Sequence, residues 1–139
     1  MSHSLEKIAF HTLGCKLNFS ETSTMARDFI NRGFSIVKDF ENANIHIINT
    51  CSVTDKADKK AKRIIKKIIQ TSDNPYITVL GCYAQLKPKQ IAQINGVNLV
   101  IGDKEKLNVA NHVIDNYKNN SVQIIHSPIG DSNNFESSF

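Results

Sequence analysis

Short runs of β-branched apolar residues alternate with helical patterns along this chain, which is typical of a parallel α/β sheet. Strands are predicted at residues 7–11, 34–37, 44–49, 76–80 and 98–101. Helices are predicted at residues 20–31, 54–70 and 88–95, and the apolar face of a last helix runs from residue 107 to 117. This alternation favours a single doubly wound, flavodoxin-like domain with a five-stranded, mainly parallel sheet of order 2-1-3-4-5.

Two parts of the chain fit this scheme less simply. Only six residues separate Val37 from Asn44, whereas a parallel crossover usually takes about a dozen or more. Either one turn around Phe40 makes the crossing, which we favour, or the second and third strands pair antiparallel. Residues 1–117 are expected to form the domain, and residues 118–139 are expected to add at most one strand, at 122–125, and a polar linker.

Length and composition narrow the class of protein. The 139 residues fit one domain. No apolar run approaches the roughly 20 residues that span a bilayer, and the first residues lack the build of a signal peptide. We therefore expect a cytoplasmic protein with no membrane partner. The net charge of +4 suits a polyanionic partner, although many basic proteins bind none.

The three cysteines lie at equivalent places in the predicted fold. Cys15, Cys51 and Cys82 each fall in a turn between the carboxyl end of a strand and the next helix. These are the first, third and fourth strands, which are neighbours in the predicted order, so their thiols should converge within roughly 10 Å. A cubane iron–sulfur cluster could bridge that span. The alternative is that the cysteines are buried core residues, since no CxxC pair marks a metal site.

The residues around the thiols bear on which metal they would bind. Gly14 and Gly81 precede two of the cysteines, so backbone could approach a bulky cofactor closely. Helix amino-termini after the cysteines would lower the thiol pKa values. Zinc is the rival metal, with His11 or His46 as a fourth ligand. Three thiols suit a 4Fe–4S cluster with one open iron better than structural zinc.

Three motifs in series resemble the amino-terminal domain of radical S-adenosylmethionine tRNA methylthiotransferases. The motifs are HTLGCKLNFSET (11–22), INTCSVTDKADKKAKR (48–63) and VLGCYAQLKP (79–88). The match is best with the branch that acts on N6-threonylcarbamoyladenosine beside the anticodon, and it runs from residue 7 to 117.

The resemblance implies roles for particular residues. Cys15, Cys51 and Cys82 would ligate an auxiliary 4Fe–4S cluster whose open iron carries the sulfur or methylthio donor. Asn18 and Asn49, with Gly14 and Gly81, would lie behind these ligands or on the substrate side. For the asparagines the alternative is a local one, because asparagine often caps turns and helices.

The same resemblance implies a larger parent enzyme. Its radical domain, in cis, binds a second 4Fe–4S cluster and S-adenosylmethionine, and a small RNA-binding domain follows. A 5′-deoxyadenosyl radical would remove hydrogen from adenine C2, and the methylthio group would be added there. This chain ends before those domains, so we expect it to bind a cluster and to catalyse no turnover alone.

The helix predicted at residues 54–70 is strongly basic. Seven of the 17 Lys and Arg residues lie between positions 56 and 67. Lys56, Lys59, Lys60 and Arg63 are candidate tRNA contacts, and the alternative is a solvated lysine face.

A flavodoxin-like flavin or nucleotide binder, or a cofactor-free thiol interaction module, would also suit the fold. No GxGxxG or Walker pattern supports nucleotide binding.

Overall fold

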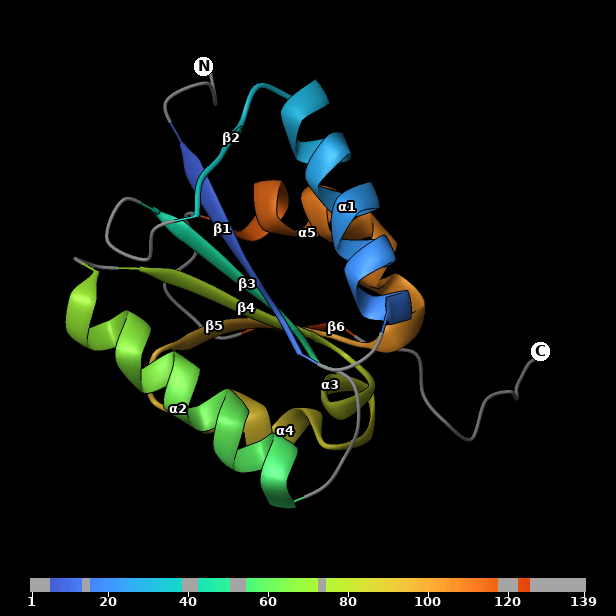
Figure 1. Cartoon of the computed structure of the whole chain (residues 1–139). Helices are drawn as coiled ribbons and strands as arrows, with labels where there is room; N and C mark the ends of the chain where they lie inside the picture. The colour runs from blue at the N-terminus through green and yellow to red at the C-terminus, as the bar shows by residue number, and fades with distance from the viewer. Residues whose placement is uncertain are drawn as a thin grey trace.

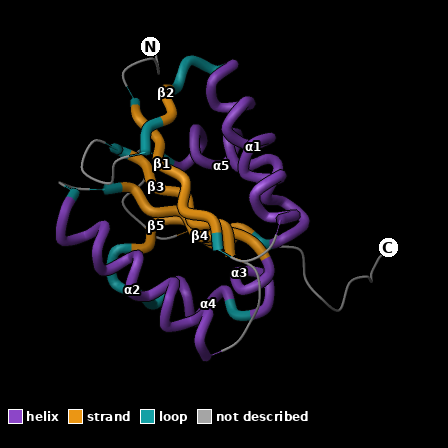
Figure 2. Tube along the Cα trace, viewed as in Figure 1, coloured by secondary structure: helices purple, strands orange, loops and turns teal. Residues whose placement is uncertain are grey.

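A parallel sheet with helices on both faces forms the protein (Figures 1 and 2). The computed structural model describes residues 6–13, 16–38, 43–50, 55–72, 75–117 and 123–125. Within these residues, six strands follow the order β2-β1-β3-β4-β5-β6, and every neighbouring pair is parallel.

The elements have the following bounds. The strands are β1 (Lys7–Thr12), β2 (Ser35–Ile36), β3 (Ile45–Thr50), β4 (Tyr76–Gly81), β5 (Val97–Ile101) and β6 (Gln123–Ile125). The helices are α1 (Lys16–Asn31), α2 (Asp55–Thr71), α3 (Cys82–Leu86), α4 (Pro88–Ala92), the 3-10 helix η1 (Asp103–Asn108) and α5 (Val109–Asn116).

The predicted fold class and strand order are confirmed, with β6 added beside β5. The antiparallel alternative for the second and third strands is wrong, because β2 and β3 both pair in parallel with β1, on opposite sides of it. The predicted turn around Phe40 lies outside the described residues. So does the linker predicted after β6, which stays a prediction.

The end of α1 follows from its sequence. Gly33, two residues after the last residue of the helix, has a φ of +98°, which favours glycine. Its N–H donates to the carbonyl of Ile30, and the N–H of Phe34 donates to the carbonyl of Phe29. Together these two bonds form a Schellman motif, and the Phe29 and Phe34 rings pack edge to face at 5.2 Å. The motif turns the chain directly into β2.

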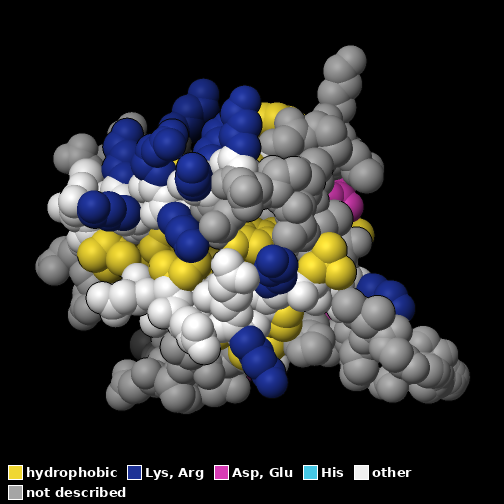
Figure 3. All heavy atoms as spheres, turned by 90° about the horizontal axis from the view of Figure 1, so that it is seen from below, with side chains coloured by type: hydrophobic (Ala, Val, Ile, Leu, Met, Phe, Trp, Pro, Cys, Tyr) yellow, Lys and Arg dark blue, Asp and Glu magenta, His cyan; other side chains and the backbone are white. Residues whose placement is uncertain are grey.

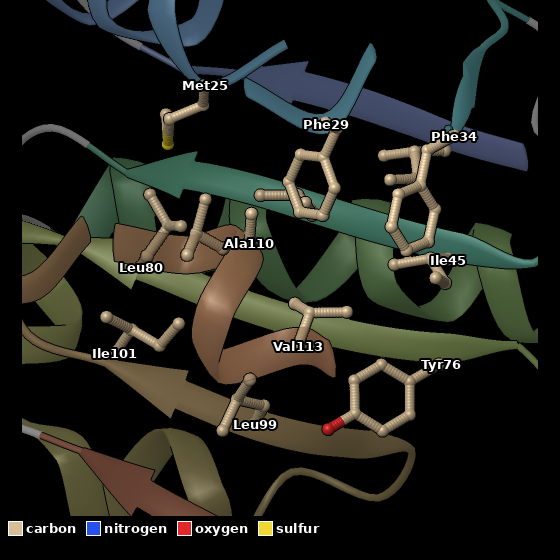
Figure 4. Packing of buried hydrophobic residues seen from close by; sticks show 13 residues of the cluster. Met25, Phe29, Phe34, Ile45, Tyr76, Leu80, Leu99, Ile101, Ala110 and Val113 are labelled. Carbon is tan, nitrogen blue, oxygen red and sulfur yellow. The ribbon is translucent and has the colours of Figure 1, made fainter. Parts of the chain in front are cut away.

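Alternating side chains of the strands build two separate cores. On one face, α1 and α5 pack Met25, Phe29 and Val113 onto the sheet (Figure 4). On the other face, α2, α3 and α4 cover the sheet with a second cluster of buried side chains (Figure 1). This second cluster includes Ile65, Ile68, Tyr83 and Ile91. Both faces are thus sealed by apolar side chains, as a parallel sheet requires.

Candidate functional site

The carboxyl ends of β1, β3 and β4 lie side by side. Thr12 pairs with Asn49, and Thr50 pairs with Gly81. Beyond the end of β1, the N–H of Leu13 donates to the carbonyl of Asn49 at 2.9 Å. The end residues of these three adjacent strands are those that directly precede the segments containing the three cysteines.

The cysteine side chains themselves are not among the described parts. Gly14, Cys15 and Cys51 lie outside the described residues. Cys82 is the first residue of α3, but its side chain, like that of Asn18 in α1, is not described. The structure therefore brings together the strand ends, and the positions of the three sulfur atoms stay a prediction.

Gly81 allows β3 and β4 to meet closely at this edge. It is buried, with a φ of +105°. A Cβ at this position would collide with the carbonyl oxygen of Thr50 and lie 2.9 Å from its Oγ1. The backbone that approaches Gly81 here is that of the neighbouring strand, and only glycine fits both the conformation and the space.

The hydroxyl of Thr50 links β3 to the turn that carries Cys82. It donates to the carbonyl of Leu80 at 2.7 Å and accepts the N–H of Tyr83 at 3.3 Å. The first turn of α3 is thereby tied to the end of the neighbouring strand. Sequence reasoning missed this role, although a threonine directly before Cys51 was a visible signal.

The side chain of Asn49 lies on the other face of the sheet from that of Thr50, toward α1. Its side chain is fully buried, and its Nδ2 donates to Oγ1 of Thr22 at 3.4 Å. The Thr22 hydroxyl also lies 2.8 Å from the hydroxyl of Thr12. These contacts join the ends of β1 and β3 to the helix that begins directly after Cys15. Asn49 therefore makes a long-range contact, in contrast to the local cap considered for it.

A buried ion pair links α1 to η1. Nζ of Lys106, in η1, lies 2.6 Å from Oε1 of Glu21, in α1, and both side chains are largely buried. Burying charge is costly unless the charges are paired. The pair therefore fixes α1 against the segment that follows β5, and no motif in the sequence indicated it.

Breaking this pair should destabilise the fold. Lys106→Met leaves Glu21 without its cation, so we expect the free energy of unfolding to fall by about 2 kcal/mol. The double variant Lys106→Met/Glu21→Leu should recover most of that loss. Lys104→Met, at an exposed lysine of the same 3-10 helix, is the control. Urea unfolding of these variants and of the single variant Glu21→Leu gives the measurement. A double variant that loses as much stability as the two singles together contradicts the coupling.

His11 and His46, the candidate fourth ligands for zinc, contact each other. Nε2 of His11 lies 3.1 Å from Nδ1 of His46, with the rings stacked at 5.4 Å. Nε2 of His46 lies 3.2 Å from the hydroxyl of Ser72. Both nitrogens of His46 thus have protein partners. Among the described residues, no three His, Cys, Asp or Glu side chains are grouped to hold a metal ion.

Acid should weaken the fold through these histidines. The pKa of each is lowered from 6.5 to about 4, chiefly by burial, and for His11 the charges of His46 and Lys67 contribute to that shift. Between pH 6.5 and about pH 4, these histidines bind more protons in the unfolded chain than in the folded one. Stability is therefore complete above pH 6.5 and is lost as pH falls, by about 1.4 kcal/mol per pH unit for one histidine.

Denaturant unfolding at several pH values between 7 and about 4.5 tests this expectation. His46→Gln should flatten the pH dependence. A wild-type stability that stays constant across this window would contradict the assignment.

The exposed face of α2 is strongly basic. All seven of its Lys and Arg side chains are exposed, including the candidates Lys56, Lys59, Lys60 and Arg63. Figure 3 shows these cations gathered on one face of the molecule. Because α2 begins four residues after Cys51, its amino end lies at the carboxyl edge of the sheet.

Comparison with known proteins identifies the family. The profile of the uncharacterized protein family UPF0004 matches residues 7–102, which is more than half of the chain. The chain belongs to the UPF0004 family. The matched region contains all three cysteines. It also contains α1 and α2, which lie on opposite faces of the sheet.

Curated relatives of this UPF0004 chain are tRNA-modifying enzymes. A threonylcarbamoyladenosine tRNA methylthiotransferase of Bacillus subtilis is 44% identical over 72% of the chain and 23% of the relative. One from Thermotoga maritima is 34% identical over 91% of the chain and 28% of the relative. A tRNA-2-methylthio-N6-dimethylallyladenosine synthase of Karelsulcia muelleri is 36% identical over 81% and 25%.

These matches confirm the resemblance to tRNA methylthiotransferases. The chain spans about a quarter of the length of the relatives that it matches. Within the described residues, no helix has the length and apolar character needed to cross a membrane.

Proposed function

We propose that this chain is the domain of a tRNA methylthiotransferase that holds an auxiliary 4Fe–4S cluster through Cys15, Cys51 and Cys82. One observation supports the proposal above all others. β1, β3 and β4 end side by side in parallel register, and each cysteine follows one of these ends within three residues of sequence. Ligands bind at this edge in open α/β sheets.

The residues present fit such a cluster. Thiolates are the usual protein ligands of iron–sulfur clusters, and three of them leave one iron of a cubane without a protein ligand. A Cys₃His zinc site would need a histidine as well. The partners of both His46 nitrogens count against that residue in this role.

The chain's own residues would hold the ligand loops in place. Thr22 and Asn49 join α1, which begins directly after Cys15, to the strand ends. Thr50 and Gly81 set the start of α3, where Cys82 stands. When bound, the cluster would supply an open iron for the sulfur donor. Gly14 and Asn18 are expected to lie beside it.

The rest of the enzyme is proposed from the relatives. Their names describe methylthio transfer to modified adenosines of tRNA. We expect transfer to C2 of N6-threonylcarbamoyladenosine, with S-adenosylmethionine and a second 4Fe–4S cluster bound by a radical domain in the same longer chain. tRNA would contact the basic face of α2, including Lys56, Lys59, Lys60 and Arg63. Because tRNA is the partner, we expect the protein in the cytoplasm.

Anaerobic reconstitution of the purified chain with iron and sulfide tests the proposal. We expect about four irons and four sulfides per chain after desalting. Parallel samples receive zinc or flavin mononucleotide. A stoichiometric zinc complex, retained flavin, or protein that stays free of metal would favour the rival functions instead.

A further inference from the structure

A groove lies on the surface between the second half of α2 and the turn that joins α4 to β5. Its volume is about 350 Å³, at the lower end of the roughly 300–1,000 Å³ typical of small-molecule sites. Isoleucines form its apolar lining, and lysines and an asparagine form most of its polar lining. The principal lining residues are Ile65, Ile69, Ile94, Lys62, Lys66 and Asn95.

The groove combines an apolar wall with cations. Ile65 is buried and Ile94 is half-buried, whereas Ile69 remains 40% exposed. Lys62 and Lys66 are exposed one turn apart on the same helix. Figure 3 shows the wider arrangement, in which a band of Lys and Arg side chains borders a strip of apolar ones.

A glycine sets the apolar wall. Gly96 has a φ of +104°, and a Cβ there would collide with Cδ1 of Ile69. The exposed side chain of Ile69 therefore packs directly on the Gly96 backbone. This contact places the side chain of Ile69 at the wall of the groove.

The isoleucines and lysines of the lining suit an occupant that is partly apolar and anionic. A nucleotide has these properties, since its base has two apolar faces and its phosphate pairs with lysine. The other cations of α2 extend this preference to a polymer. The cations of the helix run from Lys56 to Lys67, so its basic face is about 17 Å long and can follow a few phosphates of one strand.

We propose that this groove seats one unpaired base of a bound RNA, with Lys62 and Lys66 at the flanking phosphates. The choice of RNA rests on the proposed function, but the groove needs no cluster. RNA binding by the metal-free chain therefore tests the groove separately from cluster assembly.

Amide NMR of the ¹⁵N-labelled chain gives the first test, with adenosine 5′-monophosphate as the probe and inorganic phosphate as its control. The nucleotide should shift the amides of Ile69, Ile94, Asn95 and Gly96. Phosphate alone should leave the amides of residues 94–96 in place. Equal shifts with both probes, or nucleotide shifts confined to other parts of the chain, would overturn the proposal.

Matched variants give the second test, by binding to a single-stranded loop RNA and to a duplex of equal length. Ile69→Gln should weaken loop binding by about fivefold and leave duplex binding unchanged. Ile30→Gln, at an isoleucine of α1 that is 54% exposed, is the control and should change neither. Lys66→Gln should weaken both and reduce the salt slope by about one, unlike Lys104→Gln. An unchanged loop affinity in Ile69→Gln, or equal losses on both RNAs, rules out a seated base.

Discussion

Replacing Cys51 with alanine should leave a folded domain that no longer retains a 4Fe–4S cluster. Only two of the three proposed thiolates would remain, and a cubane held at two corners loses iron to solvent or chelator. We expect iron to fall from about four per chain to below about one after desalting. Iron and sulfide analysis after anaerobic reconstitution, together with visible absorption, gives the measurement.

The fold of this variant should be independent of the metal. Two apolar clusters, one on each face of the sheet, draw most of their side chains from the strands and helices rather than from the cysteine loops. Their members include the fully buried Phe29, Ile47, Ile68 and Leu99. Far-ultraviolet circular dichroism and the urea midpoint of the metal-free variant should therefore match those of the metal-free wild type.

Matched variants separate ligation from general damage to the loop. Cys15→Ala and Cys82→Ala should lose the cluster as completely as Cys51→Ala does. Ser52→Ala, at the next position in the chain, changes a hydroxyl and should keep the full iron content. A Cys51→Ala protein that retains four irons would exclude Cys51 as a ligand and contradict the proposed site.

The sequence predicts the fold well where local pattern and tertiary role agree. Strands of buried β-branched residues were recognisable because both faces of a parallel sheet are covered. The start of α1 at Lys16, four residues before the predicted one, was missed, as was the whole of α3. α3 has five residues, too few for an apolar period to show. The helical spacing of residues 20–31 places Ile30 on the apolar face with Met25 and Phe29, yet its side chain is exposed at the end of α1.

The site could be predicted only in part. The equivalence of the three cysteine loops follows from strand order, which alternating strands and helices largely determine. The supporting contacts do not follow in this way. Asn49 meets Thr22 across 27 positions, and Lys106 meets Glu21 across a larger part of the chain. Such pairs depend on how the helices pack on the sheet, and no local motif encodes them.

Gly81→Ala should be the most damaging single substitution at the carboxyl edge. Its φ of +105° and ψ of −161° lie in a region that is essentially restricted to glycine. The added methyl group would also collide with the backbone of Thr50, which cannot rotate away as a side chain can. We expect the free energy of unfolding to fall by about 3 kcal/mol or more. Because the ends of β3 and β4 must separate, reconstitution should yield less cluster.

Two other glycines separate conformational strain from collision. Gly33 has a similar φ of +98° but is exposed, so Gly33→Ala should cost only about 1 kcal/mol. Gly96→Ala should be intermediate, because the added methyl group would meet the movable end of Ile69. Urea unfolding of the three variants gives the order. A Gly81→Ala protein no less stable than Gly33→Ala would show that β3 and β4 can separate at this edge without cost, and that Gly81 does not fix the geometry of the Cys82 turn.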